Sequence, residues 1–171
     1  MPEPEVLLQY ILREVSYEKD LAGKHLLVTA GPTREAIDPV RFISNHSTGR
    51  MGYAIAKMAM LRGADVTLVS GPVALEPPMF VKTVAVESAQ EMYEAVMAEA
   101  DDADIIIKSA AVADYAPAEV SQEKIKKEQG DAVIPLVRTK DILAALGEKK
   151  REDQFICGFA METEHLLENA K

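Results

Sequence analysis

Short apolar runs alternate with longer segments of helical periodicity along most of this chain. Runs of β-type residues occupy 24–30, 64–70, 80–88, 103–115 and 154–160, and apolar residues recur at helical spacing over 51–63, 88–103 and 140–150. Continuous apolar runs are typical of strands buried on both faces, and their alternation with helices favours parallel pairing. The pattern therefore predicts an α/β fold, with a Rossmann-like, doubly wound and mostly parallel sheet in a single domain.

Local signals mark where several of these elements begin and end. Gly63 is placed as a C-terminal stop for the first crossover helix, and Ser88 with Glu91 three residues later predicts a capping box for the next. Residues 133–138 include a proline and predict an edge or hairpin strand. Residues 161–171 continue in a helical pattern. The connection between the first strand and its helix is predicted to be a polar loop of roughly 15 residues, a length that usually implies function.

The first 22 residues form a separate predicted segment. Apolar residues recur there at helical spacing, so we expect a short helix or linker over 1–22, with its apolar positions at Val6, Leu7, Tyr10, Ile11 and Val15. The acids within it and the lack of a basic leader argue against a signal peptide. The domain proper is expected over 23–171, and to be incomplete at its C-terminal end because the last helical pattern has no stop signal.

Composition narrows the classes of partner. The 171 residues include 19 Lys and Arg against 28 Asp and Glu, and the net charge of -9 disfavours binding to nucleic acid or to an anionic membrane surface. No apolar run approaches the roughly 20 residues needed to cross a bilayer. Cys157 is the only cysteine, which excludes an internal disulfide and a cysteine-based zinc site within one chain. We therefore expect a cytoplasmic protein with no nucleic acid or membrane partner.

The end of the first strand is a candidate phosphate site, because ligands of such sheets bind beyond the carboxyl ends of the strands. This strand ends at Gly31, and Ser47 and Gly49 lie at the start of the following helix. Glycines let a ligand approach the backbone, and free N–H groups at a helix start favour phosphate. The spacing matches neither a GxGxxG nor a Walker A loop. An equally weighted alternative is that Ser47 or Thr48 caps the helix while the glycines ease packing.

Two further strand ends carry candidate chemistry. The small side chains of Ala110 and Ala111 would let a ring or an anhydride lie against the backbone. Asp114 could read a base or a ribose, and Lys124 could neutralise a phosphate. Taken alone, a core strand followed by a solvated charge run is slightly favoured for this region. Phe159 could cover a base, although a phenylalanine at a strand end is usually part of the core.

Five separated motifs occur in a characteristic order along the chain. They are TAGPTREAIDPVRFISNHSTGRMG, VTLVSGP, SAAVADYAP, KIKK and GFAMET. From about Gly23 to Lys171 this series resembles the phosphopantothenate–cysteine ligases, which in bacteria are often fused to a flavin-dependent decarboxylase. The first 22 residues are similar to the segment that joins the two enzymes.

The resemblance implies a reaction in two steps. CTP and the carboxylate of 4'-phosphopantothenate would form an acyl-cytidylate with release of pyrophosphate, and Mg²⁺ would hold the phosphate charge. Cysteine would then displace CMP and give 4'-phosphopantothenoylcysteine. The resemblance also implies a homodimer, with residues 124–138 contributing to the interface.

The resemblance also implies a role for each candidate residue. Asn45 would hold the acyl-cytidylate carbonyl and Lys124 would stabilise charge during cytidylation, although an isolated loop asparagine is more often a turn former. Arg41 and Ala111 would join Asn45 on the substrate side. No metal ligand is predicted from the side chains. The CTP pocket would be formed by Gly31, Ser47, Gly49, Lys108, Ser109, Ala110, Asp114, Lys140, Asp141, Ile142, Leu143 and Phe159.

Two other functions remain open alternatives. The family domain continues beyond Lys171 into a lysine-bearing loop that closes on the triphosphate, so this chain is expected to bind CTP with little or no turnover. A non-catalytic nucleotide-binding fragment is therefore one alternative. An NAD(P)-dependent reductase is a weaker one, because the order of strands and helices is Rossmann-like but no GxGxxG follows the first strand.

Overall fold

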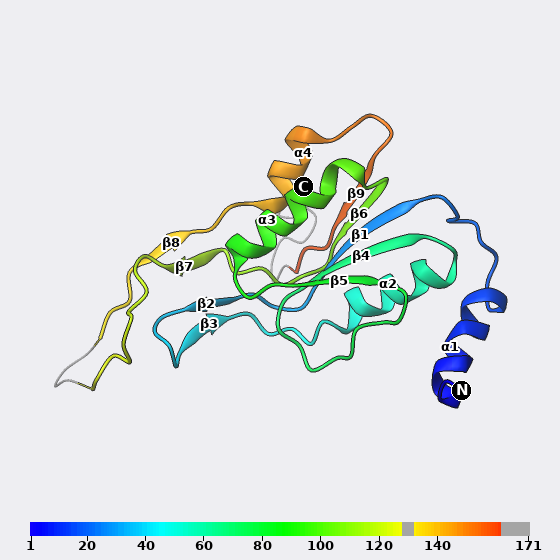
Figure 1. The fold of residues 1–171 in the computed structure, drawn as a ribbon. Helices are drawn as coiled ribbons and strands as arrows, with labels where there is room; N and C mark the ends of the chain where they lie inside the picture. The colour runs from blue at the N-terminus through cyan, green and yellow to red at the C-terminus, as the bar shows by residue number, and fades with distance from the viewer. Residues whose placement is uncertain (128–131, 162–171) are drawn as a thin grey trace.

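A five-stranded sheet forms the centre of the computed structural model, which describes residues 1–127 and 132–161. Its strands are β1 (His25–Ala30), β4 (Asp65–Ser70), β5 (Lys82–Ala85), β6 (Ile105–Lys108) and β9 (Phe155–Gly158). They lie in the order β5-β4-β1-β6-β9, and all four neighbouring pairs are parallel (Figure 1). The chain thus winds outward from β1 in one direction and then in the other, which confirms the predicted doubly wound sheet.

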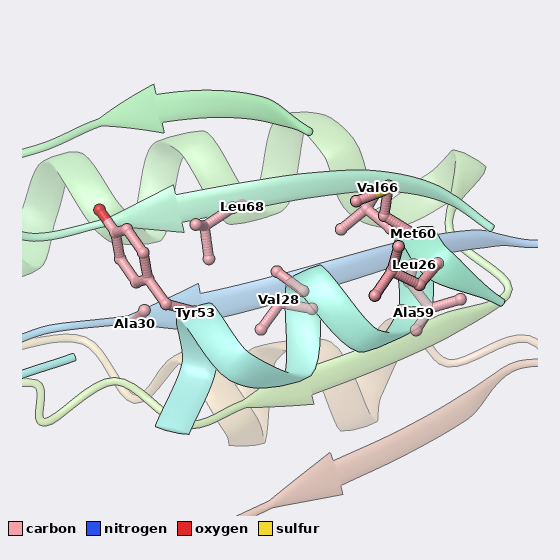
Figure 2. Packing of buried hydrophobic residues seen from close by; sticks show 10 residues of the cluster. Leu26, Val28, Ala30, Tyr53, Ala59, Met60, Val66 and Leu68 are labelled. Carbon is pink, nitrogen blue, oxygen red and sulfur yellow. The ribbon is translucent and has the colours of Figure 1, made fainter. Parts of the chain in front are cut away.

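Helices cover both faces of this sheet because successive side chains of a buried strand point to opposite sides. Leu26, Val28 and Ala30 of β1 face helix α2 (Arg50–Leu61), together with Val66 and Leu68 of β4 (Figure 2). Leu27 of β1 belongs to the cluster on the other face, to which α3 (Ala89–Glu99), the short 3-10 turn η1 (Ala100–Asp102) and α4 (Ile142–Lys149) contribute. The continuous apolar runs of the sequence are explained by this burial on two sides.

The predicted helix boundaries are largely confirmed. Gly63 follows the end of α2 with a φ of 92°, a conformation that glycine adopts at little cost. The Ser88 hydroxyl accepts a hydrogen bond from the Glu91 amide at 3.2 Å, as a capping box requires. The Glu91 carboxylate instead accepts from the amide of Glu87 at 2.8 Å, one residue earlier than the predicted pattern. Both ends of the motif therefore stabilise the start of α3.

The polar connection after β1 was wrongly predicted as a loop. It contains an antiparallel hairpin of β2 (Arg34–Ala36) and β3 (Phe42–Ser44). Contacts from distant parts of the chain hold this hairpin in place. The buried Glu35 carboxylate accepts from the Ala89 amide at 3.0 Å, and the Arg34 amide donates to the Glu87 carbonyl at 2.8 Å. These bonds come from the start of α3, which local sequence does not reveal.

A second hairpin, whose described residues are 115–127 and 132–138, projects from the body of the domain as an arm (Figure 1). It pairs β7 (Tyr115–Pro117) with β8 (Leu136–Arg138), which confirms the hairpin strand predicted within 133–138. The strand predicted over 103–115 ends earlier, at Lys108, so that prediction was wrong at its C-terminal end. The sheet ladder stops there because the Ala110 amide bonds the Thr29 hydroxyl rather than a backbone carbonyl.

The N-terminal segment forms the expected helix, α1 (Pro4–Val15), which packs beside α2. Its residue Leu12 contacts the core on the α2 face. Within the described part of the chain, no helix combines the length and apolarity that crossing a bilayer requires. The helical pattern predicted at the C-terminal end falls on 162–171, outside the described residues.

Candidate functional site

A cavity of about 600 Å³ opens beyond the carboxyl ends of β6 and β9. Its walls come from the end of β6, the start of the arm, the connection from β8 into α4, and the residues after β9. Seven residues predicted for the nucleotide pocket lie together there: Lys108, Asp114, Lys140, Asp141, Ile142, Leu143 and Phe159. The remaining lining residues are Val112, Tyr115, Arg138, Thr139 and Ala160. This cavity thus lies where the strand-end rule expects the ligand of a doubly wound sheet.

Apolar side chains form one wall of this cavity. Ile142 is buried, whereas Leu143 is 39% exposed and its side chain packs against Gly158 at the end of β9. Phe159 is 54% exposed, so it is not the core residue that the alternative interpretation assumed. An exposed aromatic ring beside aliphatic side chains is suited to cover a planar base.

Charged side chains form another part of the wall. Lys108, Arg138 and Lys140 bring three cations to the cavity, and Lys140 lies 4.6 Å from the centre of the Tyr93 ring. The Asp141 carboxylate accepts from the Ala144 amide at 3.0 Å and so caps α4. The three cations outnumber the two acids of the wall, Asp114 and Asp141, so the cavity is positive on balance although the chain as a whole is acidic.

Five lining residues were missed by the sequence prediction, namely Val112, Tyr115, Arg138, Thr139 and Ala160. Tyr115 and Arg138 are paired residues of β7 and β8, 23 positions apart in sequence. The Thr139 amide donates to the Asp114 carbonyl at 3.0 Å and fixes the base of the arm beside the cavity. For Tyr115, Arg138 and Thr139, proximity to Asp114 and Lys140 in sequence was the only available signal, because the pairing itself is nonlocal.

The predicted glycine loop lies apart from this cavity. Gly31 and Gly49 are buried and have φ values of 76° and 72°. A Cβ atom at either position would come within 3.0 Å of Val73, so both glycines permit close packing. No side chain caps α2, whose N-cap is Gly49, while the Ser47 hydroxyl accepts from the Gly49 amide at 3.3 Å. The alternative that Ser47 or Thr48 caps the helix was therefore wrong, whereas the packing role of the glycines is confirmed.

Residues 109–112 connect the glycine loop to the cavity. The Ser109 hydroxyl donates to the Thr29 carbonyl at 2.6 Å, and the Ala111 amide donates to the Gly31 carbonyl at 2.9 Å. Asn45 reaches the same segment, since its side-chain amide nitrogen lies 2.9 Å from the Val112 carbonyl oxygen and 3.4 Å from that of Ala111. Both N–H groups of Asn45 are thus directed at the backbone. Binding an acyl carbonyl would require one of them to be released.

Lys124 lies on the arm, and Arg41 lies on the β2–β3 hairpin. The buried carboxylate of Asp38 connects these two hairpins. The Asp38 side chain is fully buried and accepts from the Ile125 amide at 3.1 Å. The Arg41 guanidinium bonds the same carboxylate and donates to the Ile125 carbonyl at 3.0 Å. Asp38 and Arg41 therefore fix the residue next to Lys124. The predicted substrate role of Arg41 stays a prediction.

The Arg41 guanidinium, helped by the amides of Val40, Ile125 and Arg41, holds the pKa of the Asp38 carboxyl well below its ordinary range, against the opposing effect of burial. Because the folded-state pKa is lower than the unfolded one, the stabilisation is complete above about pH 4 and is lost as the pH falls toward the lowered pKa. Acid is therefore expected to release the arm from the hairpin.

Replacing Asp38 with asparagine is expected to loosen this junction at neutral pH. The amide group cannot match the charge of Arg41, and its N–H groups would face donors that now bond a carboxylate. We expect the amide protons of Val40 and Ile125 to exchange at least about tenfold faster. Hydrogen exchange followed by NMR measures this, with amides of β1 as an internal control. Unchanged exchange at both positions would contradict the role given to Asp38.

The described residues provide no obvious protein cage for a metal ion. Among them, no group of three or more His, Cys, Asp or Glu side chains is arranged to hold one.

The structure is a Rossmann-like α/β domain with a cavity at the carboxyl edge of its sheet, lined by both basic and acidic side chains. The chain belongs to the family described as the DNA/pantothenate metabolism flavoprotein C-terminal domain, whose model matches residues 21–171. This confirms the family to which the ordered motifs pointed.

Known proteins of this family are closely similar to the chain. The coenzyme A biosynthesis bifunctional protein CoaBC of Vibrio vulnificus (strain YJ016) is 54% identical over 147 residues, which are 85% of this chain and 37% of that protein. CoaBC of Bacillus subtilis (strain 168) is 48% identical over 174 residues, which cover 100% of this chain and 43% of that protein. The chain therefore spans about two fifths of the length of these relatives.

A solved structure supports the fold directly. The crystal structure of the C-terminal domain of a coenzyme A biosynthesis bifunctional protein CoaBC superimposes with a TM-score of 0.77 at 55% identity. The match covers 88% of this chain and 70% of that chain. The Rossmann-like architecture is thus shared with an experimentally determined member of the family.

Proposed function

We propose that this chain is the nucleotide-binding part of a ligase of coenzyme A biosynthesis, which joins cysteine to 4'-phosphopantothenate through an acyl-cytidylate formed from CTP. The observation that carries the proposal is the cavity beyond β6 and β9, where seven predicted nucleotide residues gather. The names of the relatives, coenzyme A biosynthesis bifunctional proteins, agree with this pathway.

The cavity fits a nucleoside triphosphate in size and charge. Its volume of about 600 Å³ lies within the range of small-molecule sites. Leu143 and Phe159 would cover the base, while Lys108 and Arg138 would neutralise the phosphates. Mg²⁺ bound to phosphate oxygens would withdraw charge from the leaving pyrophosphate.

The proposed reaction consists of a substitution at the α-phosphorus of CTP, followed by a substitution at the acyl carbon. A carboxylate oxygen of 4'-phosphopantothenate attacks the α-phosphorus of CTP, and the bond to pyrophosphate breaks. The amine of cysteine then attacks the acyl carbon, CMP leaves and a proton is released. In this proposal Lys124 stabilises charge in the first step. Asn45 holds the acyl carbonyl once one of its N–H groups has left the backbone.

The proposal extends to a homodimer formed through the arm. Exposed apolar side chains are concentrated on it, including Ile125, Val133, Leu136 and Val137, of which Val133 is 87% exposed. A surface of this kind on a projecting hairpin favours burial against a partner. A decarboxylase joined through the N-terminal segment is a further proposal, supported by the word bifunctional in the relatives' names.

Calorimetric titration of the chain with CTP, ATP and NADPH tests the proposed ligand. We expect saturable binding of CTP and none of NADPH. Leu143→Asp places a carboxylate where the base would lie and is expected to weaken CTP binding at least about tenfold. Leu8→Asp on α1 makes the same change at an exposed leucine outside the cavity and should leave binding unchanged. Binding of NADPH without CTP would refute the ligase proposal, and tighter binding of ATP would refute the preference for CTP.

Turnover requires a separate measurement, because the chain matches only 70% of the solved CoaBC domain. We expect a chain extended to the length of that domain to release pyrophosphate from CTP when 4'-phosphopantothenate and Mg²⁺ are present. Binding of CTP without pyrophosphate release by the extended chain would favour a non-catalytic nucleotide-binding module.

A further inference from the structure

A second cavity, of about 470 Å³, lies between α2 and the segment 75–79 that follows β4, with Gln9 of α1 at its edge. None of its lining residues lines the cavity beyond β6 and β9. It is therefore a separate site, and its volume lies within the range that holds small molecules. The proposed ligase chemistry does not use it.

The inner wall of this cavity is apolar and firmly packed. Tyr53 and Met60 of α2 are 9% and 3% exposed, because their side chains belong to the core of the sheet. Leu75 and Met79 line the opposite wall, and the two prolines between them, at 77 and 78, restrict the backbone there. A compact apolar group could bury its surface between these walls without a rearrangement of the core.

Two cations stand at the edge of the same cavity. Arg50 and Lys57 are seven residues apart on α2, so they lie on one face of the helix with the small Ala54 between them. Neither forms an ion pair with any residue in the described ranges 1–127 and 132–161. Glu76 is the single acid that lines the cavity. The edge therefore carries positive charge that a ligand could use.

The N-terminal helix holds the outer wall in place. Phe80, which follows this wall, has a φ of 66°, an uncommon conformation for a bulky residue. Its ring contacts Tyr10 of α1 edge to face, with ring centres 4.8 Å apart. The Arg13 guanidinium of α1 lies 4.8 Å from the centre of the same ring. These contacts keep the end of the wall fixed, so the cavity is formed before any ligand binds.

We propose that this cavity binds a small amphiphilic anion. The apolar body of the ligand lies between Tyr53 and Met79, and a single anionic group such as a carboxylate, sulfonate or phosphate meets Arg50 and Lys57. A neutral apolar molecule would leave these cations unused. A triphosphate would bring several charges to an apolar wall and to Glu76, at a large cost in desolvation.

The dye 8-anilinonaphthalene-1-sulfonate is a suitable probe, because it combines one sulfonate with a compact apolar body. The chain contains no tryptophan, so dye fluorescence is read without energy transfer from indole. We expect saturable binding at one site, weakened at least about tenfold by Lys57→Glu. Lys149→Glu is the matched control, since it makes the same charge change at the exposed end of α4, outside both cavities.

Further measurements keep the proposal open to refutation. Cooperative thermal unfolding of each variant shows that the dye is not reporting loosened packing. In the wild-type chain, the dye is expected to shift the amide NMR signals of Ala54 and Met79. Equal affinity of Lys57→Glu and Lys149→Glu, unmoved signals at both amides, or displacement of the dye by CTP would each overturn the site.

Discussion

Replacing Gly71 with alanine is expected to destabilise the fold by about 3 kcal/mol. Gly71 follows β4, and its amide donates to the Ala30 carbonyl at 2.9 Å. A Cβ atom at this position would lie 1.7 Å from the carbonyl oxygen of Pro32. This oxygen belongs to the backbone, so only a shift of the turn after β1 could relieve the clash. Urea unfolding followed by circular dichroism measures the loss.

Gly147→Ala is the matched control for this substitution. Gly147 lies inside α4, and no atom outside the helix backbone would come within 4 Å of an added Cβ. Alanine forms helices better than glycine, so this variant is expected to be more stable by about 1 kcal/mol. Similar unfolding midpoints for the two variants would contradict the close approach of the strand-end turns.

The alternation of apolar runs and helical segments was sufficient to predict the central sheet. Strands such as β1 and β4 are buried on both faces, and this burial leaves a direct trace in composition. The β2–β3 hairpin leaves no such trace because its strands are three residues long and its central Glu35 is a buried acid. The bond between Glu35 and the start of α3 is a tertiary contact, which overrides local preference.

The candidate site was predictable where residues follow strands directly. Lys108 ends β6 and Phe159 follows β9, so the strand-end rule brings both to one edge of the sheet. Arg138 reaches the cavity only because β8 pairs with β7, which a short run containing a proline does not specify. Gly31 and Gly49 show the converse, because they were predicted for the same pocket but do not line this cavity, and both lie close to Val73.

In a chain extended to the length of the solved CoaBC domain, Lys124→Gln is expected to slow pyrophosphate release by about 10²–10³-fold. The affinity for CTP is expected to change much less. Lys124 lies on the arm and is not among the residues that line the cavity, and we therefore do not expect it to contribute much to the affinity for CTP. Its cation would instead act on charge that develops at phosphorus. Single-turnover kinetics and calorimetry separate the two effects.

Lys126→Gln distinguishes this role from a general effect of positive charge on the arm. Lys126 is also exposed and lies on the other side of Ile125, the residue that Asp38 and Arg41 hold. Loss of either lysine changes the net charge equally, so an electrostatic effect of the whole arm would slow both variants alike. We expect Lys126→Gln to react within about twofold of the unsubstituted extended chain, because a single exposed charge contributes little at a distance. Equal slowing of both variants would mean that Lys124 has no specific role in the reaction. The contacts of Asp38 and Arg41 with Ile125 would then only hold the arm in place.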